Sequence, residues 1–232
     1  MLGRQNFVVT DDTEELFTAS LARNGIDADP KDFMQDDLYS ETLMRKLGFG
    51  EMEALDFSAY EGAGIVHDLN RKPDKSLHNQ FDMIVDGGTL EHIFNVPVAL
   101  EGVYRMLKPG GRFISMTVFN GWPSHGMYQF TAELVWTFWR RACNCEVIDC
   151  RTVPASPARA DEGQVPLLDA ANFGRRLRKI LRKIGPGRHY MYYEIEKTTK
   201  SHLPRLAFQS DYEAKWDGHE NAGETHLEKM RT

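Results

Sequence analysis

The stretch FDMIVDGGTLEHIFNVPVALEGVYRMLKPGGRFISMTVF, residues 81–119, decides the fold of this chain. It begins with the apolar run FDMIV, which is typical of a buried strand, and Asp86-Gly87-Gly88 ends that run. Apolar residues then recur at helical spacing up to Leu107, and Lys108-Pro109-Gly110-Gly111 predicts the end of the helix. Strand character returns over residues 112–118. A strand, helix and strand of this length form a right-handed crossover between parallel strands.

Ligands of an open parallel sheet bind at the carboxyl ends of its strands. The crossover therefore predicts a site at residues 86–92 and in the loop that follows Phe119. Two shorter strands, residues 52–56 and 64–68, also end in an acidic residue. We expect a doubly wound α/β sheet with helices on both faces and a ligand site along one edge.

The remaining periodic segments complete this prediction. Helices are expected from Asp11 onward and over residues 36–47 and 131–142, and strands over residues 145–153 and 189–197. Between these two strands, an insert over residues 154–188 contains a loop and a helix, whose apolar stripe is Phe173, Leu177, Ile180, Leu181 and Ile184. We expect one α/β domain over residues 1–200, insert included, and a polar C-terminal extension over residues 201–232.

The composition argues against several classes of protein. The 232 residues are 41% hydrophobic and 27% charged, which is typical of a soluble globular domain. A net charge of -6 and a pI near 5.8 give no bulk attraction to nucleic acid. No apolar run approaches the roughly 18 residues of a membrane span, and the N-terminus lacks the layout of a signal peptide. We expect a cytoplasmic protein.

Three cysteines, Cys143, Cys145 and Cys150, lie within one segment. An odd number of neighbouring cysteines favours a reducing compartment over a disulfide scaffold. Cys143 and Cys145 share one face of a predicted strand, and no nearby histidine completes a familiar ligand spacing. We therefore expect packing thiols and no metal site.

Three successive strand ends carry an aspartate: Asp56, Asp68 and Asp86. A carboxylate at such a place can accept hydrogen bonds from both hydroxyls of a ribose, or from the amino group of an adenine. Aspartate also favours turns and caps without any ligand. One aspartate would favour that structural interpretation, whereas three in successive strand–turn units favour a nucleotide-like ligand.

Four segments carry a resemblance: MEALDFS, GIVHDLN, FDMIVDGGTLEHI and RMLKPGGRFISMTV. The chain resembles the class I S-adenosylmethionine-dependent methyltransferases over residues 40–155, and more weakly over residues 189–197. The resemblance implies a mostly parallel, Rossmann-like sheet of seven strands, the last antiparallel, with S-adenosylmethionine across the first four strand ends. It assigns the ribose and adenine to Asp56, Phe57, Asp68 and Leu69, and the rest of the cofactor to Gly3, Asp86, Gly87 and Gly88.

The glycine-rich first loop of that family, of the type D/E-x-G-x-G-x-G, is absent here. Its nearest counterpart is Met1-Leu2-Gly3-Arg4-Gln5, where only Gly3 permits a close backbone approach. An LGRQ-type first loop is similar to that of a subgroup often associated with surface-polysaccharide genes. The shared segments are Tyr60-Glu61-Gly62-Ala63, His67-Asp68-Leu69-Asn70, DGGTLEHIFN and His125-Gly126-Met127-Tyr128-Gln129-Phe130. The resemblance implies that the first strand is short or truncated.

Methyl transfer to oxygen or nitrogen needs positioning and often a proton acceptor. His125 and His92 are the candidate catalytic residues, and Glu91 can orient the ring of its neighbour. The alternative for His125 is a loop histidine bonded to backbone, and the resemblance implies for His92 a structural position or one against the cofactor. Trp122, Tyr128 and Gln129 are candidate acceptor-binding residues, and Tyr128 and Gln129 could equally be packing and capping residues at a helix start.

The sequence leaves two questions of function open. The basic face of the helix at residues 173–184 can contact an anionic membrane surface or partner, or be simply solvated. The favoured function is a methyltransferase acting on a small polar acceptor, such as a sugar or glycan precursor. The alternative is a catalytically inactive binding or regulatory subunit with the same fold.

Overall fold

The computed structural model describes residues 1–204, 207–210, 212 and 215–216, and only the backbone of residues 173–177. The elements follow one another as α1 (Asp11–Arg23), α2 (Glu41–Lys46), β1 (Leu55–Asp56), β2 (Ile65–Val66), β3 (Phe81–Asp86), α3 (Val96–Met106), β4 (Leu107–Asn120), α4 (Ala132–Leu134), β5 (Glu146–Pro154), β6 (Val165–Pro166), α5 (Ala170–Leu181) and β7 (His189–Glu196). Short 3-10 helices occur at Pro30–Phe33, Lys75–Leu77, Leu90–His92 and Pro157–Arg159, and a π-helix, Val135–Ala142, continues α4.

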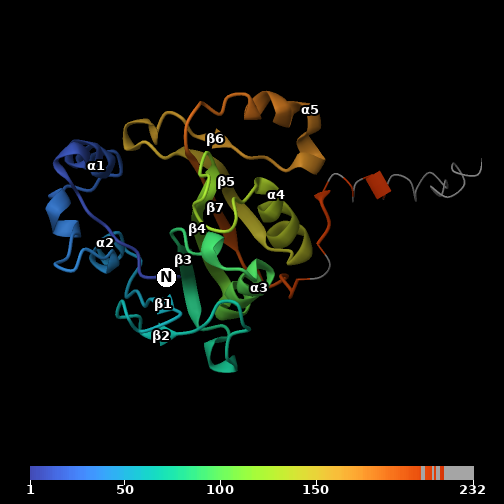
Figure 1. The fold of residues 1–232 in the computed structure, drawn as a ribbon, viewed down its shortest axis with the longest axis horizontal. Coiled ribbons are helices and arrows are strands. Elements are labelled where there is room, and N and C mark those ends of the chain that lie inside the picture. The colour runs from blue at the N-terminus through green and yellow to red at the C-terminus, as the bar shows by residue number, and fades with distance from the viewer. Residues whose placement is uncertain (205–206, 211, 213–214, 217–232) are drawn as a thin grey trace, which may run out of the picture.

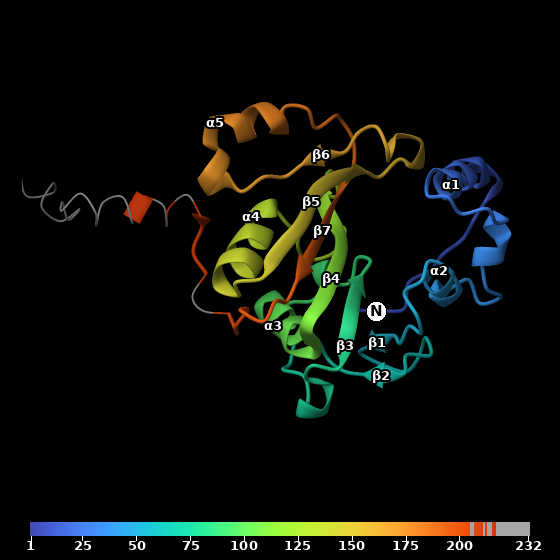
Figure 2. The same cartoon turned by 180° about the vertical axis from the view of Figure 1, so that it is seen from behind.

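The centre of the fold is a mixed five-stranded sheet with the order β3-β4-β7-β5-β6. Strands β3 and β4 are parallel, whereas β7 runs antiparallel to both β4 and β5, and β6 runs antiparallel to β5. Helices α3 and α4 lie to one side of this sheet, and the insert with β6 and α5 crosses its upper end (Figure 1). Helix α2 lies beyond the β3 edge near β1 and β2, and α1 lies farther out, toward the 3-10 helix Pro157–Arg159 of the insert (Figure 2).

A second, two-stranded parallel ladder, β1-β2, is linked to β3 by the N-terminal segment, in which Leu2 pairs with both. Leu2 makes parallel bridges to Leu55 of β1 and to Asp86 of β3. Its N–H donates to the Val85 carbonyl at 2.8 Å, and the Gly3 N–H donates to the Leu55 carbonyl at 2.8 Å. The mixed α/β class is confirmed. The structure has ladders of two and five strands that meet at Leu2, and it does not show the finer detail of one mostly parallel sheet of seven strands.

The crossover from β3 through α3 to β4 has the predicted order. Helix α3 carries Pro97 in its first turn, where the missing N–H costs no helical hydrogen bond. The predicted helix end at Lys108-Pro109-Gly110-Gly111 is confirmed closely, since α3 ends at Met106, but the segment lies within the bounds of β4 and not in a turn before it. A register shift between the pairs of Phe81 and Met83 accommodates it, and Gly110 supplies the required φ of +83°.

The helix predicted over residues 36–47 is also shorter than expected, since α2 begins only at Glu41. The Asp37 carboxylate accepts hydrogen bonds from the Tyr39 N–H and the Gln35 side chain, which favours a turn. Leu38 adopts a φ of +64° and is 44% exposed, so it does not belong to a buried stripe.

Aromatic packing fills the core between the sheet and the helices. The Phe113 ring of β4 lies 5.5 Å from Trp139 and 5.7 Å from Tyr193, measured between ring centroids. The predicted helix over residues 131–142 is present, although most of it is the π-helix rather than an α-helix. The predicted packing thiols are confirmed as buried, free cysteines: Cys143, Cys145 and Cys150.

An ion pair helps to anchor the insert to the core. Asp169 caps α5 by accepting from the Ala171 N–H, and its two oxygens accept from the Arg141 guanidinium at 2.8 and 2.7 Å. Strand β6, which the sequence did not predict, pairs with β5 and lengthens the sheet by one edge strand.

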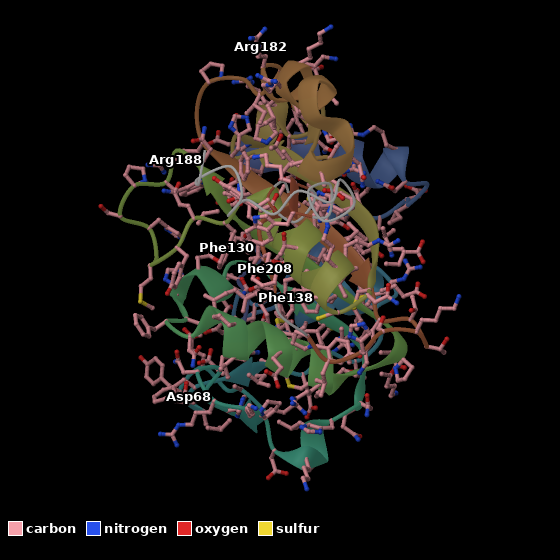
Figure 3. All side chains as sticks on the ribbon, turned by 90° about the vertical axis from the view of Figure 1, so that its right-hand side faces the viewer. Asp68, Phe130, Phe138, Arg182, Arg188 and Phe208 are labelled. Atoms are coloured by element: carbon pink, nitrogen blue, oxygen red, sulfur yellow. The ribbon has the colours of Figure 1, made fainter. Side chains whose placement is uncertain are left out.

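The predicted stripe of α5 is only partly described. Ile184 packs against the core and Leu181 is 37% exposed, whereas the side chains of Phe173 and Leu177 lie outside the described residues. Arg182 projects outward from the upper end of the molecule (Figure 3). No helix in the described part of the chain is long and apolar enough to cross a membrane.

Candidate functional site

Three predicted site residues, Gly3, Asp56 and Asp86, come together where Leu2 joins β1 to β3. Gly3 adopts a φ of +61°, and a Cβ added to it would lie 2.7 Å from Thr89 Oγ1 and 3.9 Å from Asp56 Oδ2. Glycine is therefore required both by the backbone conformation and by the crowding on one side.

Asp56 ends β1 with a half-buried side chain. Its Oδ1 accepts a hydrogen bond from the Phe57 N–H, which turns the chain away from the strand. Its Oδ2 accepts no hydrogen bond from any residue that the structure describes, and Phe57 beside it is 72% exposed. A carboxylate oxygen without a partner, next to an exposed aromatic ring, is suited to a ribose and an adjoining flat base.

Asp68 lies farther along the same edge and projects from the lower flank of the molecule (Figure 3). Its Oδ1 accepts from both the backbone and the side-chain nitrogen of Asn70 at 2.9 Å, and Arg71 lies 3.5 Å from Oδ2. The bonds from Asn70 lower the pKa of Asp68 below its usual value. The Leu69 side chain is buried in the core, so only its backbone is available to a ligand.

Asp86 supports the turn after β3. Its side chain is 1% exposed; Oδ1 accepts from the N–H groups of Gly88 and Thr89, and Oδ2 accepts from Ser115 Oγ at 2.8 Å. Burial raises the pKa of this carboxyl. Asp86 therefore shapes the turn, and any cofactor contact there falls to the backbone of Gly87 and Gly88.

Two polar residues at this junction, Gln5 and Thr89, were not assigned from the sequence. Gln5 Nε2 donates to the Leu2 carbonyl at 3.0 Å, and Thr89 Oγ1 donates to the same carbonyl at 2.8 Å. Gln5 also covers Gly87, where an added Cβ would lie 2.6 Å from Gln5 Oε1. The LGRQ segment contained the signal, since it places an amide two residues after the glycine of the loop.

A second cluster consists of Glu91, His92 and His125. The Glu91 side chain is 1% exposed, its Oε2 makes no hydrogen bond, and its Oε1 lies 3.9 Å from His125 Nε2. The ring centroids of His92 and His125 are 5.2 Å apart. Burial, and to a lesser degree a neighbouring carboxylate, raises the pKa of Glu91 to about 7. The tertiary fold thus brings both predicted histidines to one buried acid.

Gly126 explains why the His125 loop packs so closely on Glu91. The Glu91 carbonyl accepts from the N–H groups of Met127 at 2.8 Å and Tyr128 at 3.2 Å. Gly126 has a φ of +71°, and an added Cβ would lie 2.9 Å from the same carbonyl oxygen. The absent side chain therefore sets the distance between the loop and Glu91.

We expect Gly126→Ala to destabilise the protein by about 2 kcal/mol, because the alanine is strained by its φ and also collides with backbone. The matched control is Gly25→Ala, where φ is +70° and nothing lies within 4 Å of the added Cβ. Urea denaturation should show that Gly25→Ala lowers the free energy of unfolding by only about 1 kcal/mol. Equal losses in the two variants would show that the contact with Glu91 is unimportant.

The candidate acceptor residues flank the cluster. The Trp122 ring lies 5.3 Å from His125 and 4.8 Å from Tyr190, and the Arg188 guanidinium lies 4.8 Å from the Trp122 centroid. Gln129 Oε1 accepts from the Trp122 N–H and closes the loop. Tyr128 is 37% exposed and donates its hydroxyl to the Phe94 carbonyl at 2.8 Å. The Gln129 amide oxygen and the Tyr128 hydroxyl therefore already have hydrogen-bond partners within the chain.

The two clusters are neighbours, since a Cβ added to Gly88 would lie 3.1 Å from Glu91 Oε1. The turn after β3 thus has the Gly3–Asp56 junction on one side and the Glu91 cluster on the other. A sequence profile described as Methyltransferase domain matches residues 36–153, half of the chain. The chain belongs to this methyltransferase family. A comparison with curated proteins finds no match.

Solved structures similar to this methyltransferase-family chain include the MccD protein, at 16% identity over 70% of this chain and 86% of that one, with a TM-score of 0.43. The 1,6-didemethyltoxoflavin-N1-methyltransferase of Burkholderia thailandensis, solved with S-adenosylhomocysteine, is 18% identical over 68% and 66%, with a TM-score of 0.39. The phosphoethanolamine N-methyltransferase 2 of Haemonchus contortus, solved with S-adenosylmethionine, is 16% identical over 69% and 46%, with a TM-score of 0.39. Membership of the family rests on the profile match and not on these likenesses.

Proposed function

We propose that this chain is an S-adenosylmethionine-dependent methyltransferase that acts on an oxygen or nitrogen of a small polar acceptor. The observation that carries the proposal is the junction at Leu2, where the crowded Gly3 lies beside an Asp56 oxygen that has no described partner. A close-approach glycine and a free carboxylate at one strand edge fit a cofactor that has an amino-acid end and a ribose.

Different residues of the chain would bind different parts of the cofactor. Asp56 would hold the ribose hydroxyls, Phe57 would cover the base, and Asp68 with the Leu69 backbone would meet the adenine edge. Gly3 and the Asp86-Gly87-Gly88 turn would line the methionine end. When bound, S-adenosylmethionine supplies an electrophilic methyl group on a sulfonium sulfur.

His125 would accept the proton that the acceptor loses, since its Nε2 is next to Glu91 and its side chain is 45% exposed. Glu91 would orient the imidazole and stabilise its charged form, and His92 would contact the same acceptor. Trp122, Tyr128 and Gln129 would enclose it. We favour a sugar or glycan precursor as acceptor because of the LGRQ-type loop.

We expect Asp56→Asn to weaken binding of S-adenosylhomocysteine at least about tenfold, or roughly 1.4 kcal/mol, because an amide keeps one acceptor and loses the charge. Titration calorimetry measures this directly. The control is Asp27→Asn, an exposed aspartate outside the site, which should bind like the wild type. A folded wild type that releases no heat at high cofactor concentration would reject the proposal.

The second candidate is a methyltransferase-fold binding or regulatory subunit without catalysis. The observation that favours it is Gln5, which fills the space over Gly87. Cofactor binding without transfer of a labelled methyl group to any member of a panel of sugar and amine acceptors would support it. Transfer to one acceptor, abolished in His125→Ala, would exclude it.

We also propose a cytoplasmic location, no nucleic-acid partner and contact of the basic helix at residues 173–184 with an anionic partner or membrane surface. The net charge of -6 argues against a nucleic-acid partner, and the anionic contact is supported by four exposed cations, Arg178 and Lys179 in α5 and Arg182 and Lys183 directly after it.

A further inference from the structure

We infer that Glu91, His92 and His125 form a binding site for a divalent transition-metal cation of the Zn²⁺ class. One carboxylate oxygen and two imidazole nitrogens from these residues all lie within 4.8 Å of one another. Two histidines and one carboxylate are the donor set of open zinc sites and of non-haem iron sites. This site lies beyond the proposed function and stands without it, because cation binding requires neither cofactor nor acceptor.

The strongest independent observation is the Glu91 carboxylate. Its side chain is 1% exposed, yet Oε2 makes no hydrogen bond, and no lysine or arginine of the described chain pairs with it. A buried carboxylate without a partner is costly, and a bound cation removes that cost. Glu91 is also held in place, because its carbonyl accepts two backbone hydrogen bonds from the His125 loop.

The two imidazoles are available as ligands. His92 and His125 are both exposed, and neither ring nitrogen hydrogen-bonds to another described residue. Tetrahedral ligands at about 2.1 Å from a zinc ion lie roughly 3.4 Å apart, so the imidazoles need to turn inward by a small amount. Their exposure permits this rotation, while Glu91 stays fixed.

The position of the site determines what a cation would do. Glu91 Oε1 borders Gly88 on one side, and the Trp122 ring borders His125 on the other. A three-ligand cation leaves coordination positions open, and an acceptor hydroxyl bound there would become more acidic. With the cation bound, His92 and His125 act as its ligands, so the proposed role of His125 as proton acceptor belongs to the cation-free protein.

The test is a calorimetric titration of chelator-treated, full-length protein with Zn²⁺. We expect about one equivalent to bind with a Kd in the micromolar range or tighter, and Glu91→Gln, His92→Gln and His125→Gln each to weaken it at least about tenfold. The control is His78→Gln, whose ring contacts the Pro73 carbonyl away from the cluster. Binding of Co²⁺ should also give visible absorption bands that the three variants lose.

Two further measurements make each outcome decisive. Circular dichroism checks that each variant is folded. Because His92 and His125 are exposed, their variants should stay folded even if the substitution of the buried Glu91 unfolds the protein. Zn²⁺ affinity that is the same in the wild type, His92→Gln and His125→Gln overturns the site. A separate titration with S-adenosylhomocysteine tests the cofactor, so its failure alongside intact Zn²⁺ binding would reject the proposed function and leave the metal site standing.

Discussion

Leu2→Ala is expected to lower the free energy of unfolding by about 2–5 kcal/mol, the range for large-to-small changes in a close-packed core. Leu2 is 1% exposed, and it packs in the main core cluster with Leu55 and Ile84. Because it also connects the β1-β2 ladder to β3, the cavity would lie at the seam between two sheets. Urea denaturation followed by circular dichroism measures the loss.

The control is Leu16→Ala, at a residue of α1 that is 39% exposed, which should cost well under half as much. Leu2→Ala should also weaken S-adenosylhomocysteine binding in the fraction that stays folded, because Gly3 follows directly from the seam. Equal urea midpoints of unfolding for Leu2→Ala and Leu16→Ala would contradict the structural role of Leu2 between the two ladders.

Lys197→Met is expected to destabilise the protein by about 3 kcal/mol, because it leaves buried acceptors without a donor. The ammonium is buried and donates to Asn79 Oδ1 at 2.9 Å and to the carbonyls of Tyr104 and Leu107 at 2.9 and 2.7 Å. These carbonyls lie at the C-terminal end of α3, where a cation is favoured. Lys200→Met, on the exposed turn that follows, is the control and should be nearly neutral.

The pH dependence gives a second readout for Lys197. Burial lowers the pKa of Lys197 below its ordinary value of 10.5, so the unfolded chain holds this proton more tightly than the folded one. Stability from this group therefore rises as pH climbs from the lowered pKa toward 10.5. The difference in unfolding free energy between the wild type and Lys197→Met should grow over that window. A constant difference would show that Lys197 is not desolvated.

The elements that the sequence predicted well are those with strong local signals. Strand β3, helix α3 and strands β5 and β7 carry apolar patterns long enough to specify their type, and their order follows from general rules of connection. The errors occur where local and tertiary forces compete. Lys108-Pro109-Gly110-Gly111 has the composition of a helix stop and does follow the end of α3, yet it lies within β4 as an irregular segment between the β3 pairs of Leu107 and Arg112. Strand β6 has too few residues to show any periodicity.

The residues of the candidate site show the same difference between local and tertiary signals. Gly3 and Asp56 could be selected because a glycine in a first loop and an acid at a strand end each have a local physical reason. Glu91 could not be ranked above other acids, because its burial and its missing partner arise only when the His125 loop packs against it. Ligand spacing gave no metal site in the cysteine segment, and such spacing detects neighbours in sequence and not two loops that meet in space.

The amino-acid sequence by itself determined the class of fold, the methyltransferase resemblance and the edge at which a ligand would bind, because these depend on patterns repeated within short segments. Only the tertiary structure decided that Leu2 pairs with both ladders, that the Asp86 carboxylate accepts the hydrogen bonds of its own turn, and that Glu91, His92 and His125 form one cluster. The physical reason is that burial and hydrogen-bond partners belong to the assembled chain. A carboxylate gains or loses its function according to which atoms, distant in sequence, pack around it.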